Sequence, residues 1–162
     1  MATQHYHTIH DIVYHKTIRS HEHYPACNAT FLFALMKQES GFDAQIVSHA
    51  GARGLMQMMP ATGVTQAKHE GVNGFSPDAL FVPDTNVRLG TAYIRDLERK
   101  YQGNLYFTLA HYNAGPEALG TWMPQLANRP VDEMVEDIGF SETREYVKRV
   151  LSNYWTYQML YE

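Results

Sequence analysis

The sequence is poor in cysteine and in long apolar runs. Its 162 residues include one cysteine, Cys27, which excludes a framework of internal disulfide bonds. No apolar run approaches the roughly 20 residues that a membrane-spanning helix needs, and the polar, histidine-rich N-terminus MATQHYHTIH shows no signal peptide. We therefore expect no membrane insertion by this chain, and we interpret Cys27 as a partly buried thiol rather than a lipid attachment site.

The sequence also lacks an excess of positive charge. Its 13 Lys and Arg and 17 Asp and Glu residues give a formal net charge of −4. A nucleic-acid backbone needs a basic partner surface, and an anionic membrane attracts polybasic segments, so neither class of partner is expected. With 44% hydrophobic and 19% charged residues, the composition is that of a soluble globular protein. We expect one monomeric domain over residues 1–162, whose first 28 residues form a helical N-terminal extension.

Strand signals are weak along the whole chain, and the helical period of apolar residues dominates. The sequence therefore predicts an all-α fold with little or no β structure and about seven to nine short helices. In the first half of the chain, the sequence predicts a helix around Ile9, Ile12 and Val13, one over 29–40 with Asn28 as N-cap, a short one through 55–57 and one starting at Pro60. In the second half, it predicts a helix over about 85–101 capped by Asp84, one from about Leu105 to 114–116, one over 117–126 and a last one capped by Ser141. The apolar stripe of the last helix consists of Val147, Val150, Leu151, Tyr154 and Tyr161.

Glu39 poses the main chemical question. Leu32, Leu35 and Met36 line one helical face, and Glu39 continues that face by one more turn. The carboxyl group either swings out to solvent or pairs with a base, or it is kept partly desolvated. Burial raises the pKa of a carboxyl group, and an acid that is still protonated near neutral pH can break a glycosidic bond. Periodicity alone favours the solvent-exposed or base-paired alternative.

Two later segments shift the balance toward a buried acid. Gln57 interrupts the Met-rich segment GLMQMMP, and a buried amide there needs partners and could hold a sugar hydroxyl or acetamido group. Tyr112 and Asn113 come directly before Ala-Gly-Pro at a helix end, where a hydroxyl and an amide are well placed to line a groove. Each of these residues could also be ordinary core or cap.

Four blocks resemble the catalytic domain of the soluble lytic transglycosylases. They are QES at 38–40, GLMQMMP at 54–60, YNAGP at 112–116 and FSETREYVK at 140–148, and PDTN at 83–86 is similar to the entry to the family's long middle helix. One block alone is a weak signal, but four in this order and spacing are specific. The resemblance covers about residues 31–157 and implies a lysozyme-like, mainly helical fold with a substrate groove. The first 28 residues carry no family motif.

Carried over by position, the resemblance implies that Glu39 is the sole catalytic acid and base. The substrate-binding residues that it implies all line the groove, and they are Ser48 near the acetamido group of the reacting sugar, Gln57, Met59, Tyr112 beside the catalytic carboxyl, Asn113, and Glu136 as a second acid used for binding. Two residues depart from the family. His111 stands where a small residue is usual and could crowd the core or titrate there, and Gly139 stands where proline is frequent and could loosen the loop that carries Glu136.

The activity implied is that of a bacterial enzyme of the periplasm or cell envelope. It would cleave the β-1,4 bond between N-acetylmuramic acid and N-acetylglucosamine in peptidoglycan glycan strands and leave a 1,6-anhydro product, with no metal or cofactor. A goose-type lysozyme would hydrolyse the same bond, and a non-catalytic peptidoglycan-binding or scaffold module would leave it intact. The intact Glu39, Gln57 and Tyr112 argue against a module that only binds.

Histidine is abundant, with nine residues in the chain, six of them before residue 24. Their spacing includes no matching set of cysteines or carboxylates typical of a catalytic zinc site. We interpret them as part of a solvated polar segment, or as adventitious ligands, and expect no metal centre.

Overall fold

The structure, a computed structural model, describes residues 28–127 and 129–161, without the side chains of residues 131 and 132. Its helices, in chain order, are α2 (Ala29–Ser40), α3 (Pro60–His69), the 3-10 helix η4 (Pro77–Phe81), α4 (Pro83–Lys100), α5 (Leu105–Leu126), α6 (Val131–Glu136) and α7 (Ser141–Tyr161). Within these residues the only strand-like pairing is two isolated bridges, from Arg53 to Val47 and to Met58. The predicted all-α fold is confirmed. The predicted helix around Ile12 and the thiol of Cys27 lie outside the described residues.

Helix α2 begins and ends where its sequence predicts. The side-chain oxygen of Asn28 accepts a hydrogen bond from the Phe31 backbone N–H at 2.7 Å, as an N-cap does. Gly41 follows the helix with a φ of 57°, the left-handed conformation that commonly ends helices. Leu32 and Leu35 are fully buried, so α2 is a core helix whose last turn reaches the edge of the core.

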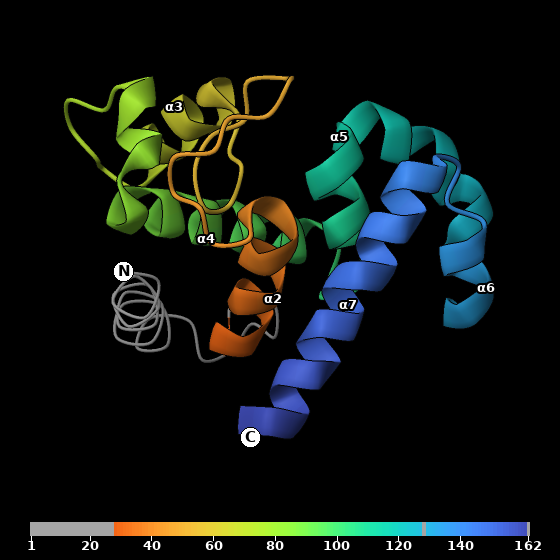
Figure 1. Ribbon diagram of the computed structural model, residues 1–162. Helices are drawn as coiled ribbons and strands as arrows, with labels where there is room; N and C mark the ends of the chain where they lie inside the picture. Colours follow the sequence, from red (N-terminus) through yellow and green to blue (C-terminus); the bar gives the residue numbers. More distant parts are fainter. Residues whose placement is uncertain (1–27, 128, 162) are drawn as a thin grey trace.

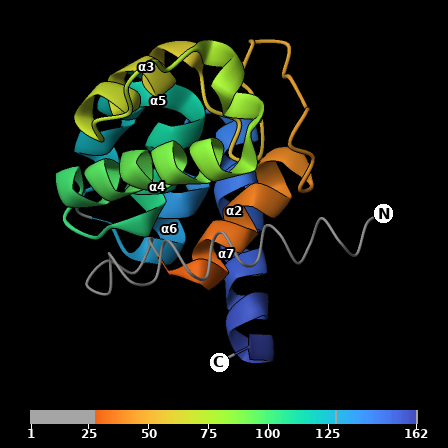
Figure 2. The ribbon, with the colours of Figure 1, turned by 90° about the vertical axis from the view of Figure 1, so that its left-hand side faces the viewer.

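Helix α7 packs along α2 and completes the core (Figure 1). The rings of Phe31 and Tyr154 meet edge to face, with centroids 5.5 Å apart, and Val147 and Val150 are fully buried. Figures 1 and 2 both show the C-terminal end of α7 extending beyond the other described helices. Tyr161 is 75% exposed there. Its predicted place in the buried apolar stripe is wrong, because this end of α7 extends beyond the helices against which it could pack.

Helix α5 contains the break predicted at residues 114–116. Gly115 has φ 83° and ψ 172°, far from helical values, and Pro116 starts the second segment, where proline needs no donor. The break lets one helix end at the site and another run on to Leu126. The side chain of Asn104 accepts a hydrogen bond from the Phe107 N–H at 3.1 Å, an N-cap that was not identified from the sequence.

Two local predictions are wrong. Residues 55–57 form a turn rather than a short helix, because Gln57 has a φ of 46° and the backbones of Arg53 and Met58 exchange two hydrogen bonds. Asp84 lies inside the first turn of α4 rather than capping it, because the helix already starts at Pro83. The short helices η4 and α6 were not predicted.

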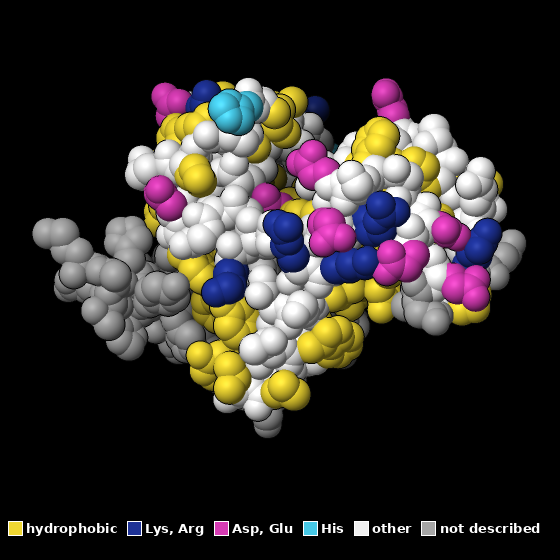
Figure 3. Space-filling view, turned by 45° about the vertical axis from the view of Figure 1, so that its right-hand side comes forward, with side chains coloured by type: hydrophobic (Ala, Val, Ile, Leu, Met, Phe, Trp, Pro, Cys, Tyr) yellow, Lys and Arg dark blue, Asp and Glu magenta, His cyan; other side chains and the backbone are white. Residues whose placement is uncertain are grey.

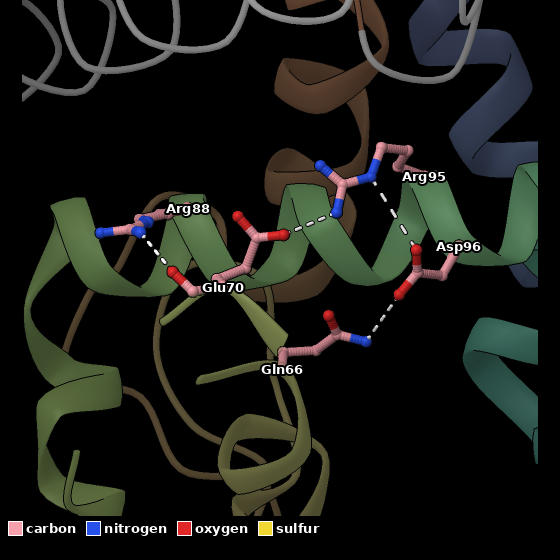
Figure 4. Close-up of polar contacts among 5 residues, drawn as sticks. All are labelled: Gln66, Glu70, Arg88, Arg95 and Asp96. Carbon is pink, nitrogen blue, oxygen red and sulfur yellow. Dashed lines mark hydrogen bonds and ion pairs between the residues drawn. The ribbon is translucent and has the colours of Figure 1, made fainter. Parts of the chain in front are cut away.

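A polar network joins the C-terminal end of α3 to α4 (Figure 4). Arg95 pairs with Glu70 at 2.6 Å, and both side chains are mostly buried. Arg88 donates to the Glu70 backbone carbonyl at 2.8 Å, and the Gln66 amide donates to Asp96 at 3.2 Å. These contacts hold the C-terminal end of α3 against α4.

Candidate active site

Glu39 lies in the last turn of α2, at the end of a fully buried apolar face. Met36, one turn earlier, has no exposed surface, and the Ser40 hydroxyl donates to the Leu55 backbone carbonyl at 2.8 Å. The hydroxyl of Tyr146 on α7 donates to Glu39 Oε1 at 2.5 Å. The carboxyl group therefore stands at the border of the core with one fixed hydrogen-bond donor.

The environment of Glu39 changes its acidity. Burial raises the pKa of the Glu39 carboxyl from 4.5 to about 7, although the hydrogen bond from Tyr146 acts in the opposite direction by stabilising the carboxylate. Near neutral pH both the acid and the carboxylate are populated. Such a group can donate a proton in one step and accept one in the next. The desolvated alternative considered for Glu39 is the one that the structure shows.

Two tyrosine hydroxyls flank this carboxyl group. Tyr146 is 6% exposed, and the hydroxyl of Tyr112 on α5 donates to the Met56 backbone carbonyl at 2.6 Å. The pKa of each phenol lies well above 10, because both are buried and the charge of Glu39 is close by. Both tyrosines therefore stay protonated and act as hydrogen-bond donors when Glu39 ionises.

Residues 54–60 form a turn that Asn86 of α4 holds in place. The Asn86 side chain is completely buried, accepts from the Met56 N–H at 2.8 Å and donates to two backbone carbonyls, one of them that of Leu80. Gly54, with a φ of 74°, lies so close that a Cβ there would overlap the Leu80 carbonyl. This turn presents the Met56 carbonyl to Tyr112.

The amide of Gln57 has the partners that a half-buried amide needs. Its Nε2 donates to the backbone carbonyls of Gly54 at 3.0 Å and Ile46 at 3.2 Å. These bonds support the strained backbone of Gln57 itself, whose φ is positive. The amide nitrogen is therefore occupied within the protein.

The remaining predicted groove residues lie on other segments. The Ser48 hydroxyl accepts from the Ala52 N–H at 3.0 Å, and Met59 is 42% exposed at the start of α3. Asn113 is exposed, and its side-chain oxygen accepts from the Thr143 hydroxyl at 2.8 Å, which ties α5 to α7.

Glu136 lies on the surface at the end of α6. Its carboxylate pairs with Lys148 at 2.6 Å, and that hydrogen bond lowers its pKa. Figure 3 shows acidic and basic side chains interleaved across this side of the molecule, below a hollow at its upper edge. Among the described residues, no hydrogen bond or ion pair joins Glu136, Ser48 or Met59 to Glu39.

Both departures from the family pattern have a structural explanation. The His111 ring packs in the core, since only 6% of the residue is exposed. Burial, together with the charge of Lys100, lowers the pKa of His111 to about 4, so the ring is neutral near pH 7. Gly139 lies directly under the indole of Trp122, where a Cβ would overlap the ring. The glycine therefore allows close packing of the loop that follows Glu136.

Three residues of the site were missed as functional candidates. Tyr146 and Thr143 stand inside the block at 140–148, and Asn86 inside PDTN, but neither block was used to assign a hydrogen-bond partner. A tyrosine on the buried stripe of α7 was the available signal, because a buried hydroxyl needs a partner.

The described residues contain no group of three His, Cys, Asp or Glu side chains arranged to hold a metal ion. In the same part of the chain no helix is long and apolar enough to cross a membrane. The six N-terminal histidines lie outside the described residues.

The sequence and the fold are similar to those of known proteins. The chain is 40% identical over 126 residues to the soluble lytic murein transglycosylase of Escherichia coli K12, an alignment that covers 76% of this chain and 19% of that protein. The crystal structure of the 70 kDa soluble lytic transglycosylase from Escherichia coli matches with a TM-score of 0.82 and 35% identity over 93% of this chain and 24% of that one. An inactive glutamate-to-glutamine mutant of lytic transglycosylase Slt from Pseudomonas aeruginosa matches with a TM-score of 0.74 and 38% identity over 82% of this chain and 22% of that one.

These similarities define an all-helical fold of the lysozyme-like superfamily. The sequence profile of the transglycosylase SLT domain matches residues 16–135, and the chain belongs to that family. The match begins inside the segment where no motif was placed, and it ends just before Glu136. The chain spans about a fifth of the length of the relatives named above.

Proposed function

We propose that this chain is a peptidoglycan lytic transglycosylase that cleaves the β-1,4 bond between N-acetylmuramic acid and N-acetylglucosamine and forms a 1,6-anhydro product. One observation carries the proposal: Glu39 has a pKa of about 7 and is held by the Tyr146 hydroxyl at 2.5 Å. A carboxyl group with this acidity can serve as acid and base in turn, as a reaction with one catalytic carboxyl group requires.

In the first step, protonated Glu39 gives its proton to the bridging oxygen. The bond between that oxygen and C1 of the muramic acid breaks, its electron pair stays on the leaving sugar, and C1 becomes oxocarbenium-like. The acetamido oxygen of the same sugar shares the positive charge. Glu39 is now a carboxylate, and the hydroxyl of Tyr146 donates a hydrogen bond to it.

In the second step, the Glu39 carboxylate takes the proton of the C6 hydroxyl of the same sugar. The C6 oxygen forms a bond to C1 and closes the 1,6-anhydro ring, so the enzyme returns to its starting protonation state and no water is consumed. The attack is intramolecular, and well-oriented reactions of this kind reach effective molarities of about 10⁵ M or more. This advantage favours ring closure over hydrolysis.

The other predicted groove residues have substrate-binding roles in this proposal. Because Gln57 Nε2 donates to backbone carbonyls, its side-chain oxygen is the atom assigned to a sugar hydroxyl or amide. Asn113 and Met59 offer an exposed amide and an exposed apolar side chain. Ser48 is assigned to the acetamido group, and Glu136, ionised beside Lys148, to a polar group further along the strand.

The relatives support this proposal. Those named above are lytic transglycosylases, and one structure is an inactive mutant in which a glutamate is replaced by glutamine. We further propose that the chain acts as a monomer on glycan strands in the cell envelope, without a metal or cofactor.

Digestion of purified sacculi, followed by mass spectrometry of the products, tests the proposal. The expected products carry the anhydro ring and are lighter by one water than the products of hydrolysis. Glu39→Gln should fold, bind sacculi and release nothing. Products with reducing ends would assign the chain to the lysozyme-type hydrolases, and binding without turnover by the unaltered chain would assign it to the scaffold modules.

A further inference from the structure

His111 stands one residue before Tyr112, yet its side chain enters the core. Its Nδ1 lies 2.6 Å from the Tyr101 hydroxyl, and only 6% of the residue is exposed. The charged and titratable groups around the ring are Tyr101, Tyr93 and Lys100, all at the C-terminal half of α4 or just beyond it. Because the His111 ring is buried, hydrogen-bonded and neutral, it affects its neighbours through packing rather than through charge.

Tyr93 of α4 contacts both His111 and Tyr112. The Tyr93 and His111 rings meet edge to face with centroids 6.3 Å apart, and the Tyr93 and Tyr112 rings are tilted with centroids 5.5 Å apart. Successive side chains of a helix point about 100° apart, so one ring contacts both only if it lies in the angle between them. His111 therefore supports one side of Tyr93, and Tyr112 the other.

Tyr112 links these rings to the acid. Its hydroxyl donates to the Met56 carbonyl at 2.6 Å, and its phenol is close enough to Glu39 for the carboxylate charge to raise the phenol pKa. A displacement of the Tyr112 ring would break the bond to Met56 and admit water beside Glu39. The position of this ring thus bears directly on the desolvation of the acid.

We propose that His111 is a positioning residue that, through Tyr93, fixes the ring of Tyr112 beside Glu39 and keeps water from the carboxyl group. His111 touches neither the acid nor the groove, and it acts through two rings. This role rests on the proposed function of Glu39 and deepens it, because it names what maintains the acidity on which both steps depend.

The variant His111→Ala leaves a void beside Tyr93. With more freedom for Tyr93 and Tyr112, water reaches Glu39, and the titration midpoint of Glu39 falls toward 4.5 by about one pH unit. Turnover falls by about 10-fold because a smaller fraction of Glu39 is protonated at pH 7 and water enters beside it. KM changes less than turnover, since Tyr112 is the groove residue affected and Gln57, Met59 and Asn113 are untouched.

Two measurements follow the effect. The Glu39 midpoint is read by carbon-13 NMR of side-chain-labelled glutamate, with the signal assigned by its absence in Glu39→Gln. Turnover and KM are measured on soluble glycan strands released from sacculi. Leu126→Ala is the matched control, because Leu126 is 1% exposed on the same helix but lies beyond the Gly115 break. It should lower thermal stability without moving the Glu39 midpoint.

A double variant separates the ring from its hydrogen bond. His111→Phe with Tyr101→Phe keeps a ring against Tyr93 and leaves no buried hydroxyl without a partner, so it should fold even where His111→Ala does not. The expected result is a Glu39 midpoint within about 0.3 pH units of the unaltered protein and nearly full turnover.

The role of His111 is overturned if a folded His111→Ala leaves both midpoint and turnover unchanged. It is also overturned if Leu126→Ala shifts the midpoint equally, or if the double variant shifts it as far as His111→Ala. The NMR midpoint needs no activity. A midpoint that moves as expected in a chain that does not cleave sacculi would therefore refute the proposed function and leave the positioning role standing.

Discussion

The hydroxyl of Tyr146 lies 2.5 Å from Glu39 Oε1, although the two residues are 107 positions apart in the chain. The contact joins the last turn of α2 to the second turn of α7, the two helices that share the core. It is the one hydrogen bond to Glu39 among the described side chains, and it favours the carboxylate, whereas burial favours the acid. The acidity of Glu39 is the balance of these two effects.

Replacing Tyr146 by phenylalanine should shift that balance. Tyr146→Phe removes the donor but keeps the buried ring, so the pKa of Glu39 should rise above its present value of about 7, by about one unit. The alkaline limb of the pH–activity profile should move upward with it, while maximal turnover falls because the carboxylate loses its support in the second step. Kinetics across pH and NMR titration of Glu39 measure both effects.

Tyr154→Phe is the control for this change. Tyr154 is buried on the same helix and bonds Asn28 and Gln158 rather than the acid. It should leave the Glu39 midpoint in place. A midpoint that falls or stays constant in Tyr146→Phe would show that the short contact does not stabilise the carboxylate.

The raised pKa of Glu39 also predicts a pH dependence of stability. The pKa of Glu39 in the folded protein, about 7, exceeds its ordinary value of 4.5, so between these two pH values the folded protein binds one more proton than the unfolded chain. The stabilising contribution is complete below pH 4.5 and is lost as pH rises through 7. Each pKa unit corresponds to about 1.4 kcal/mol, so the full effect is on the order of 3 kcal/mol.

Glu39→Gln should remove this dependence. Relative to the unaltered protein, the variant should gain stability as pH rises, with most of the gain between about pH 5 and about pH 8. Urea unfolding at both pH values measures the difference. A gap between the two proteins that stays constant with pH would mean that Glu39 titrates with an ordinary pKa.

Features set by interactions within a few residues could be predicted from the sequence, whereas features set by contacts between distant segments could not. Asn28, Gly41 and Gly115 act on their own backbone, and the helix boundaries that they set were predicted correctly. Gln57 has a positive φ because its turn is pinned from α4, and the local Met-rich pattern predicted a helix instead. The partner of Glu39 could not be read from local pattern, because a hydrogen bond across 107 residues depends on how α2 and α7 pack.

Asn86 should be essential to the turn at residues 54–60. Asn86→Ala leaves the Met56 N–H and the buried Leu80 carbonyl without partners and removes one of the two hydrogen bonds to the Arg53 carbonyl, which we expect to cost about 3 kcal/mol of unfolding free energy. Turnover should fall as well, because the Met56 carbonyl that accepts from Tyr112 is no longer held. Asn73→Ala, at an exposed loop position, should change stability by less than about 0.5 kcal/mol. Equal stability of the two variants in urea would contradict the role of Asn86.

Gly139 should be coupled to Trp122. A Cβ at residue 139 would overlap Nε1 and two carbons of the Trp122 indole, and the ring cannot move aside without repacking. Gly139→Ala should therefore destabilise the protein by about 1–3 kcal/mol. In a Trp122→Ala background the same change should cost almost nothing, which gives a coupling energy of similar size in a double-mutant cycle. Gly120→Ala on α5, where a Cβ would meet open space, should instead stabilise by about 0.5–1 kcal/mol. If Gly139→Ala costs the same with and without the indole, Trp122 is not what the glycine accommodates.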